Sequence, residues 1–185
     1  MIFEWRSYDL VPGRAVEYLS AFAQEGLPLA TRHLPLGGYW LAETGALNRI
    51  YHLWIYANLN ERDACRAGLA SEEAWVKGFV PRAFPLITRQ ENRLLRLVRG
   101  SEALDAVIAS RRQPHAARPA DAALFAPALM TLTLGAAPDA GLACWEVTHG
   151  EAVGQTLALS RDVPEAPTGS SAHLLLRPLA LSPLS

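Results

Sequence analysis

The sequence lacks the charge excess and the cysteine spacing that mark several large classes of protein. Its 17 basic and 18 acidic residues give a net charge of −1, without the basic surplus that binding to a phosphate backbone requires, so we expect no nucleic-acid partner. Two cysteines, Cys65 and Cys144, lie far apart and match no zinc or redox spacing. We therefore expect no metal site, no disulfide and a reducing compartment.

Long apolar runs and phosphate-binding loops are also missing. No stretch approaches the roughly 18 apolar residues of a membrane span, and residues 1–6 carry early charges instead of a signal-peptide core, so we expect no membrane partner and a cytoplasmic location. Gly37 and Gly38 precede a predicted strand and do not open a helix, which argues against a nucleotide site. We expect no cofactor.

The pattern that is present predicts an α+β fold in the first half, because 50% hydrophobic content is ample for a packed core. Alternation, helical spacing and Gly or Pro punctuation predict six elements there. They are a strand over 2–10, a helix from Pro12 interrupted at Gly26 and Pro28 with a second piece to Leu34, strands over 39–44 and 49–57, a helix over 60–79 with Asn60 as N-cap, and a strand over 89–98. This order is the split βαβ arrangement of ferredoxin-like folds.

Both faces of the predicted sheet carry side chains that favour burial. In the strand over 50–56, one side carries His52, Trp54 and Tyr56, and the other carries Tyr51, Leu53 and Ile55. Two helices cover only one face, so the other must meet a second sheet, either from another chain or from the second half. We favour a homodimer, with a single-chain barrel as the alternative.

The second half is harder to interpret. A helix is predicted over 101–112 and strands over 129–134, 142–148, 155–160 and 172–179, with a Pro- and Ala-rich crossing segment between. The domain prediction is a ferredoxin-like domain over 1–99, a helix and linker over 100–127, and a β-rich half over 128–185 that is a degenerate second ferredoxin-like unit with shortened helices.

Short motifs in the first half resemble the NIPSNAP family. The opening alternation of Glu4, Arg6 and Tyr8 before Pro12 and Gly13 matches the start of those domains. Further fragments follow in the family's order: Glu25-Gly26-Leu27-Pro28, Gly38-Tyr39, Glu43-Thr44-Gly45, His52-Leu53-Trp54, Arg62 and Gln90-Glu91-Asn92-Arg93. The resemblance spans about half the chain, and residues 101–185 retain neither the proline-glycine opening nor the His-x-Trp motif.

The resemblance implies a dimeric α+β barrel but no agreed activity. Proteins of this fold include cofactor-free monooxygenases, haem-degrading proteins, muconolactone isomerases and chlorite dismutases, so the fold alone does not select a reaction. Whether the protein is an enzyme therefore stays open.

Strand parity suggests one group of side chains that could line the barrel. Candidate catalytic residues are His52 as a general base, Arg6 as the holder of an anionic group and Tyr8 as a donor to an oxygen. Candidate substrate-binding residues are Glu4, Glu43, Trp54, Tyr56 and Asn92. Trp5 and Trp40 are expected on the opposite face, against the helices.

Three functions compete at this stage. The first is a barrel cavity that binds a small hydrophobic or aromatic molecule for oxygenation or isomerisation. The second is a non-catalytic dimerising or interaction module with a filled barrel. A solid barrel would favour it, whereas a site for a small ligand should show a void of roughly 300 Å³ or more lined by convergent polar groups. The third is haem or metal binding through His52, although a buried histidine of this kind is more often a packing residue.

Overall fold

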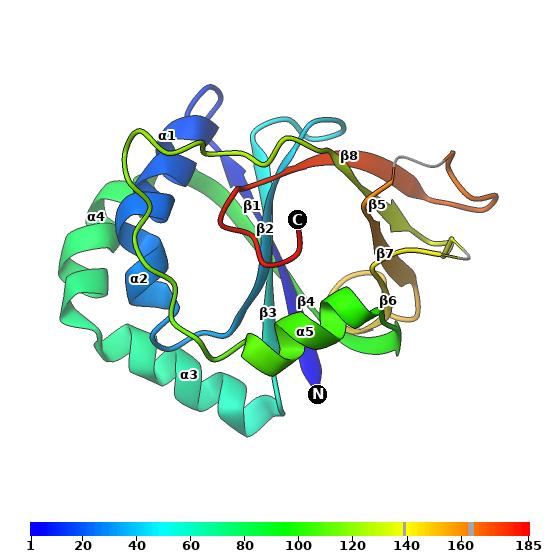
Figure 1. The fold of residues 1–185 in the computed structure, drawn as a ribbon, viewed down its shortest axis with the longest axis horizontal. Coiled ribbons are helices and arrows are strands. Elements are labelled where there is room, and N and C mark those ends of the chain that lie inside the picture. The colour runs from blue at the N-terminus through cyan, green and yellow to red at the C-terminus, as the bar shows by residue number, and fades with distance from the viewer. Residues whose placement is uncertain (139, 163–164) are drawn as a thin grey trace.

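The computed structural model describes residues 1–138, 140–162 and 165–185 of the chain. Within these residues, eight strands form one closed barrel in the order β1-β3-β2-β8-β5-β7-β6-β4 (Figure 1). The barrel is completed within one chain by two pairings between the halves, β2 with β8 and β4 with β6. The second half therefore supplies the sheet that the first half was expected to need.

The first half contains four strands and a layer of short helices. Its main elements are β1 (Ile2–Leu10), α1 (Ala15–Ala21), α2 (Leu27–Ala30), β2 (Leu36–Ala42), β3 (Arg49–Tyr56), α3 (Leu59–Ser71), α4 (Val80–Ala83) and β4 (Ile87–Arg99). Two π-helical turns, Phe22–Gly26 and Ala74–Phe79, link these helices, and a 3-10 turn at Phe84–Leu86 leads into β4. The strand order β2-β3-β1-β4 is the ferredoxin-like order predicted from the sequence.

Two local predictions about the helices need correction. α1 gives way to a π-helical turn that ends at Gly26, and Pro28 lies in the first turn of α2, but this second piece ends at Ala30 and not at Leu34. A Cβ at Gly26 would lie 2.7 Å from the Phe22 ring and 2.8 Å from the Phe79 ring, so glycine permits close packing there. The N-cap of α3 is Asn58 and not Asn60, since the Asn58 side chain accepts from the Glu61 backbone N–H at 2.9 Å.

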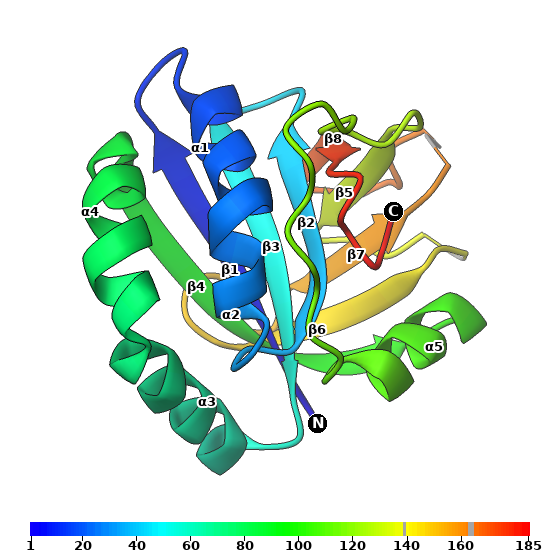
Figure 2. The same cartoon turned by 60° about the vertical axis from the view of Figure 1, so that its left-hand side comes forward.

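The second half adds one helix and four strands. These are α5 (Glu102–Ser110), β5 (Met130–Leu134), β6 (Ala143–His149), β7 (Thr156–Ser160) and β8 (Ala172–Pro178). Between α5 and β5 the chain crosses the molecule beside α2, where the His115 backbone N–H donates to Thr31 Oγ1 at 2.9 Å and the Arg118 N–H donates to the Ala23 carbonyl at 2.9 Å (Figure 2).

Side chains from every strand fill the barrel interior. One buried residue from each of β1 to β8, in order, is Phe3, Trp40, Leu53, Leu95, Leu132, Trp145, Leu157 and Leu176. Leu104 of α5 and Leu184 near the C-terminus pack against the same cluster. The interior is therefore a packed core.

The two faces of the first-half sheet are oriented the opposite way from the sequence prediction. Trp5 and Trp40, expected against the helices, stack inside the barrel with ring centroids 5.2 Å apart. Glu4, Arg6 and His52 lie instead on the face that the helices cover. The core of the closed interior is lined by apolar groups, and the buried carboxylate of Glu4 lies on the opposite face, where arginines of α3 meet it.

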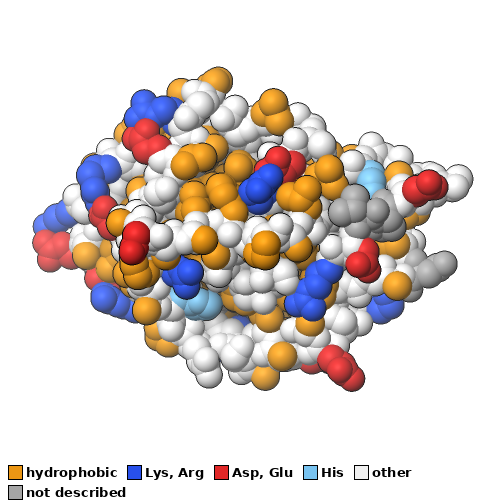
Figure 3. Space-filling model, turned by 45° about the horizontal axis from the view of Figure 1, so that its top comes forward, with side chains coloured by type: hydrophobic (Ala, Val, Ile, Leu, Met, Phe, Trp, Pro, Cys, Tyr) orange, Lys and Arg blue, Asp and Glu red, His pale blue; other side chains and the backbone are white. Residues whose placement is uncertain are grey.

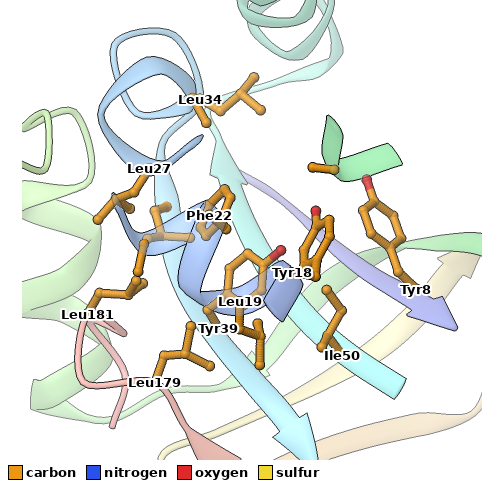
Figure 4. Close-up of a cluster of buried hydrophobic side chains, with 14 of the residues drawn as sticks. Tyr8, Tyr18, Leu19, Phe22, Leu27, Leu34, Tyr39, Ile50, Leu179 and Leu181 are labelled. Carbon is orange, nitrogen blue, oxygen red and sulfur yellow. The ribbon is translucent and has the colours of Figure 1, made fainter. Parts of the chain in front are cut away.

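The helix-covered face has its own buried cluster. Figure 4 shows Tyr18, Leu19 and Phe22 of the first helical region packed over Tyr39 and Ile50 of the sheet. Among the described residues, no helix combines the length and the apolar character needed to cross a membrane. On the face shown in Figure 3, hydrophobic side chains alternate with charges of both signs.

Candidate functional site

A cavity of about 280 Å³ lies between the helix layer and the first-half sheet. Its polar lining includes Arg6 of β1, His52 of β3, Arg66 of α3 and Gln90 of β4. The rest of the wall is mainly aromatic and aliphatic: Tyr8, Tyr18, Phe22, Ala30, Leu34, Tyr39, Trp54, Leu69, Ala70, Trp75 and Phe84. A few polar groups thus converge in an otherwise apolar pocket, as in many small-molecule sites.

The protonation of His52 follows from its neighbour on the same strand. Residues two apart on a strand share a face, and the Trp54 indole Nε1–H, which can only donate, lies 2.6 Å from His52 Nδ1. Nδ1 therefore accepts, and the proton of the neutral ring sits on Nε2. Burial, reinforced by the positive charge of Arg6, lowers the pKa of His52 well below its usual value. At neutral pH His52 is an uncharged ring with an Nε2–H donor.

This arrangement bears on the roles considered for His52. A general base or a haem or metal ligand needs a free nitrogen lone pair, but Trp54 occupies the one on Nδ1 and Nε2 carries the proton. Nε2 is buried and has no hydrogen-bond partner among the described residues. This geometry leaves His52 without a free lone pair for proton abstraction or metal ligation, and its Nε2 is a hydrogen-bond donor.

Three tyrosines surround this histidine. The Tyr39 ring stacks on His52 with centroids 4.8 Å apart and 9° between planes, and the Tyr8 ring meets it edge-on at 4.6 Å. Tyr18 shares a hydrogen bond with Tyr39, and burial raises the pKa of both phenols (Figure 4). Tyr18 and Tyr39 therefore stay protonated at physiological pH, and the Tyr8 and Tyr39 rings fix the orientation of His52.

Glu4 holds the charged wall of the site together. Its carboxylate is fully buried and accepts hydrogen bonds from the following groups: Arg6 Nη1 at 3.1 Å, Arg62 Nη2 at 2.9 Å, Arg66 Nη2 at 2.8 Å and Asn92 Nδ2 at 2.9 Å. Burial alone would raise the pKa of Glu4, but the hydrogen bond from Arg62 and the charge of Arg66 outweigh it and hold the pKa well below its usual range.

The sequence candidates separate into three groups. Arg6, Tyr8, His52 and Trp54 line the cavity. Glu4, Tyr56 and Asn92 do not line the cavity but contact one another next to it: Asn92 donates to Glu4, and the Tyr56 hydroxyl lies 3.5 Å from the Glu4 carboxylate. Glu43 lies elsewhere, at the end of β2, where its carboxylate accepts from Arg177 Nε. Their functional roles stay predictions.

Sequence reasoning missed Arg66, Tyr18, Tyr39 and Trp75 as lining residues. Arg62 and Arg66 could have been found from the sequence. They lie four residues apart, so they share one face of a helix, and the acidic residue of the first strand needs a basic partner. The described residues contain no cluster of three or more His, Cys, Asp or Glu side chains suited to a metal ion. Cys65 and Cys144 are buried free thiols.

Comparison with known proteins supports the resemblance seen in the sequence. A family model described as NIPSNAP matches residues 3–102. The human protein NipSnap homolog 3A is 35% identical over 99 residues, which cover 53% of this chain and 40% of that protein. The chain thus matches about two fifths of the length of this curated relative.

Two solved structures are similar over the same half. A NIPSNAP domain protein from Burkholderia xenovorans shares 33% identity over 52% of this chain and 93% of its own, with a TM-score of 0.50. A nipsnap family protein of unknown function from Agrobacterium tumefaciens shares 34% identity over 55% of this chain and 92% of its own, with a TM-score of 0.53. The family resemblance is confirmed for the first half.

Proposed function

The chain belongs to the NIPSNAP family, and from its site we propose that it binds a small, mostly apolar molecule between its helices and its sheet. The observation that carries the proposal is the apolar cavity itself, in whose wall polar side chains from three strands and a helix converge. The His52 Nε2–H has no partner among the described residues, and a buried donor left unpaired costs about 1–3 kcal/mol, which a ligand that reached it with a hydrogen-bond acceptor would recover.

The size of the cavity fits a small ligand. Its volume of about 280 Å³ lies close to the lower end, ~300 Å³, of typical small-molecule pockets. Packed at the density of a protein interior, ~0.74, it accommodates a molecule of roughly 200 Å³, about one or two rings. Trp75 and Phe84, which lie edge to face with centroids 6.1 Å apart, offer an aromatic wall for such rings.

The location differs from the one predicted from the sequence. The barrel interior is filled, as the interaction-module alternative requires, but the cavity lies on the other face of the sheet. Ligand binding outside the barrel therefore remains compatible with a filled barrel. Oxygenation or isomerisation of the ligand stays a prediction, and the donor form of His52 supports orientation of a carbonyl more than proton abstraction.

The test is a titration with an uncharged aromatic ketone, 2-acetylnaphthalene, followed by quenching of tryptophan fluorescence. Wild-type protein should bind it saturably. Ala70→Trp places a large ring at the exposed rim of the cavity and should weaken binding at least tenfold. Ala67→Trp is the matched control, because Ala67 is also exposed on α3 but does not line the cavity. No saturable binding, or equal binding by both variants, would refute the proposal.

A second variant isolates the histidine donor. His52→Asn keeps an acceptor near the Nδ1 position for Trp54 and removes the Nε2–H. We expect about tenfold weaker binding of the ketone, equivalent to one hydrogen bond of ~1.4 kcal/mol. If the variant folds and its affinity for the ketone is unchanged, His52 does not contribute to binding.

We also infer that the second half is a degenerate repeat of the first, which supports the predicted division into 1–99, 100–127 and 128–185. The strand order β8-β5-β7-β6 matches β4-β1-β3-β2 when the strands of each half are numbered in sequence. No helix lies between β5 and β6 or between β7 and β8 among the residues that the structure describes, and α5 precedes the first strand of the repeat.

Oligomeric state and location stay predictions. A homodimer was favoured because one face of the first-half sheet needed a second sheet to cover it. That reason no longer applies, since β5 to β8 close the barrel within the chain. Light scattering after size-exclusion chromatography would decide between a monomer and a homodimer. A cytoplasmic location rests on the sequence alone.

A further inference from the structure

The arginines around Glu4 outnumber the carboxylates that neutralise them. Arg6, Arg62 and Arg66 all donate to Glu4, and Arg62 also contacts the exposed carboxylate of Asp63 at 3.3 Å. Asp63 is exposed and balances Arg62, so Arg6 and Arg66 share the single carboxylate of Glu4, which leaves one positive charge in excess. Arg6 and Arg66 line the cavity and Arg62 does not, so the unbalanced charge borders the pocket.

The unpartnered groups at the cavity are all of one kind. Among the described residues, His52 Nε2 and Arg66 Nε are buried without a hydrogen-bond partner, and both side chains line the cavity. Each of these atoms carries a hydrogen and can only donate. A ligand that satisfies them must present acceptor atoms, and a carboxylate presents two oxygens.

Arg6 is held in place before any ligand arrives. Its Nε donates to the Tyr8 hydroxyl at 3.3 Å, its Nη1 to Glu4 at 3.1 Å and its Nη2 to Gln90 at 3.3 Å. Because its side chain is only 14% exposed, the positive charge is shielded from bulk water. A fixed and partly desolvated cation of this kind favours an anion without a large loss of side-chain entropy.

Resting on the proposed function, we propose that the ligand is a small monocarboxylate with an aromatic or alkyl body, its head group bound by Arg66, Arg6 and the His52 Nε2–H. The body lies against the apolar wall formed by Phe22, Trp75 and Phe84. Glu4 is a positioning residue, which orients the two cavity arginines and leaves one charge for the ligand.

The experiment compares 2-naphthoate with 2-naphthamide, which share the ring system and differ in charge, by isothermal titration calorimetry at pH 7.5. Wild-type protein should bind the acid at least tenfold more tightly than the amide. Arg66→Gln should abolish this preference and leave amide binding within about threefold. Arg62→Gln is the matched control, because Arg62 contacts Glu4 as closely as Arg66 does but lies outside the cavity.

The outcomes separate the two proposals. If neither compound binds wild-type protein, the proposed cavity function fails together with this inference. If both bind with equal affinity, the cavity function stands and the carboxylate assignment is overturned. A loss of preference in Arg62→Gln as large as in Arg66→Gln would overturn the assignment to the cavity arginines. Should Arg66→Gln fail to fold, the acid-to-amide ratio of the wild type still decides.

Discussion

The two faces of the first-half sheet show how one set of strands supports both a solid core and a hollow site. The inward face carries Phe3, Trp5 and Leu53, which pack in an apolar core shared with the second half. The outward face carries Glu4, Arg6 and His52 and packs against helices around a cavity of about 280 Å³. Alternation along the strand puts these surfaces one residue apart.

The difference shows where polar side chains can be tolerated. A barrel interior closed by eight strands pairs the strands' backbone groups with one another and offers few partners to a buried charge. A helix layer can project long side chains such as Arg62 and Arg66 onto the strands. It also fills the space above a sheet less completely than a second sheet does. Under the proposed function, the stabilising core and the binding site lie on opposite faces, which the following variants test.

The largest effect is expected from opening the barrel core. Trp40 is fully buried, stacks on Trp5 and donates its indole N–H to Met130 Sδ at 3.2 Å, so Trp40→Ala should lower the free energy of unfolding by about 4 kcal/mol. Trp75→Ala on the cavity side should cost less than about 2 kcal/mol, because Trp75 is partly exposed. Urea denaturation of both variants measures this contrast, and equal losses would break the comparison of the faces.

The next effect comes from the buried carboxylate. Glu4→Gln leaves three arginines without their common negative charge and should cost about 3 kcal/mol at pH 7, at the low end for a broken buried pair because the arginines are partly exposed. The folded-state pKa of Glu4 is depressed, so its contribution is complete above the unfolded pKa of about 4.3 and is lost as the pH falls through the folded value. The wild-type advantage in urea denaturation should therefore shrink below about pH 4. A constant difference from pH 7 to pH 3 would contradict this account.

The buried histidine predicts a second pH dependence. The unfolded chain protonates His52 near pH 6.5 and the folded chain does not, so the wild type should lose up to about 1.4 kcal/mol per pH unit as the pH falls below 6.5. His52→Asn removes this contribution and preserves that of His115, whose pKa is also lowered by burial. Unfolding free energies at pH 7, 6 and 5 measure the difference. Parallel pH profiles would show that His52 is charged in the folded protein.

Much of the fold could be predicted because it depends on local patterns. Alternation in the strand that contains His52 and Trp54, and punctuation by Gly and Pro, gave the strands of both halves to within a few residues. Which face turns inward could not be predicted from the same pattern, since both faces of that strand are apolar enough for burial. That choice depends on the second half and on arginines of α3, which are distant in sequence.

The candidate site was predicted in part for the same reason. Arg6, His52 and Trp54 lie on one strand face and could be grouped by parity, whereas Tyr18 and Trp75 join them only through helix packing. Glu43 was grouped with them by parity and resemblance. β2 ends at Ala42, so alternation no longer fixes the direction of the next side chain.

The smallest effect is expected at Glu43, which sharpens the comparison by serving as a carboxylate outside the site. Its partner Arg177 also lies over the Phe125 ring, with 5.8 Å from the guanidinium carbon to the ring centroid, so the arginine keeps a second contact when the pair is broken. Glu43→Gln should change the free energy of unfolding by less than about 1 kcal/mol, as expected for a partly exposed pair, and should leave the affinity for 2-naphthoate within twofold of wild type. Calorimetry beside Arg66→Gln checks this. A loss of affinity as large as that of Arg66→Gln would mean that the ligand reaches the β2–β8 junction, and the separation of binding and stability between the two faces would have to be abandoned.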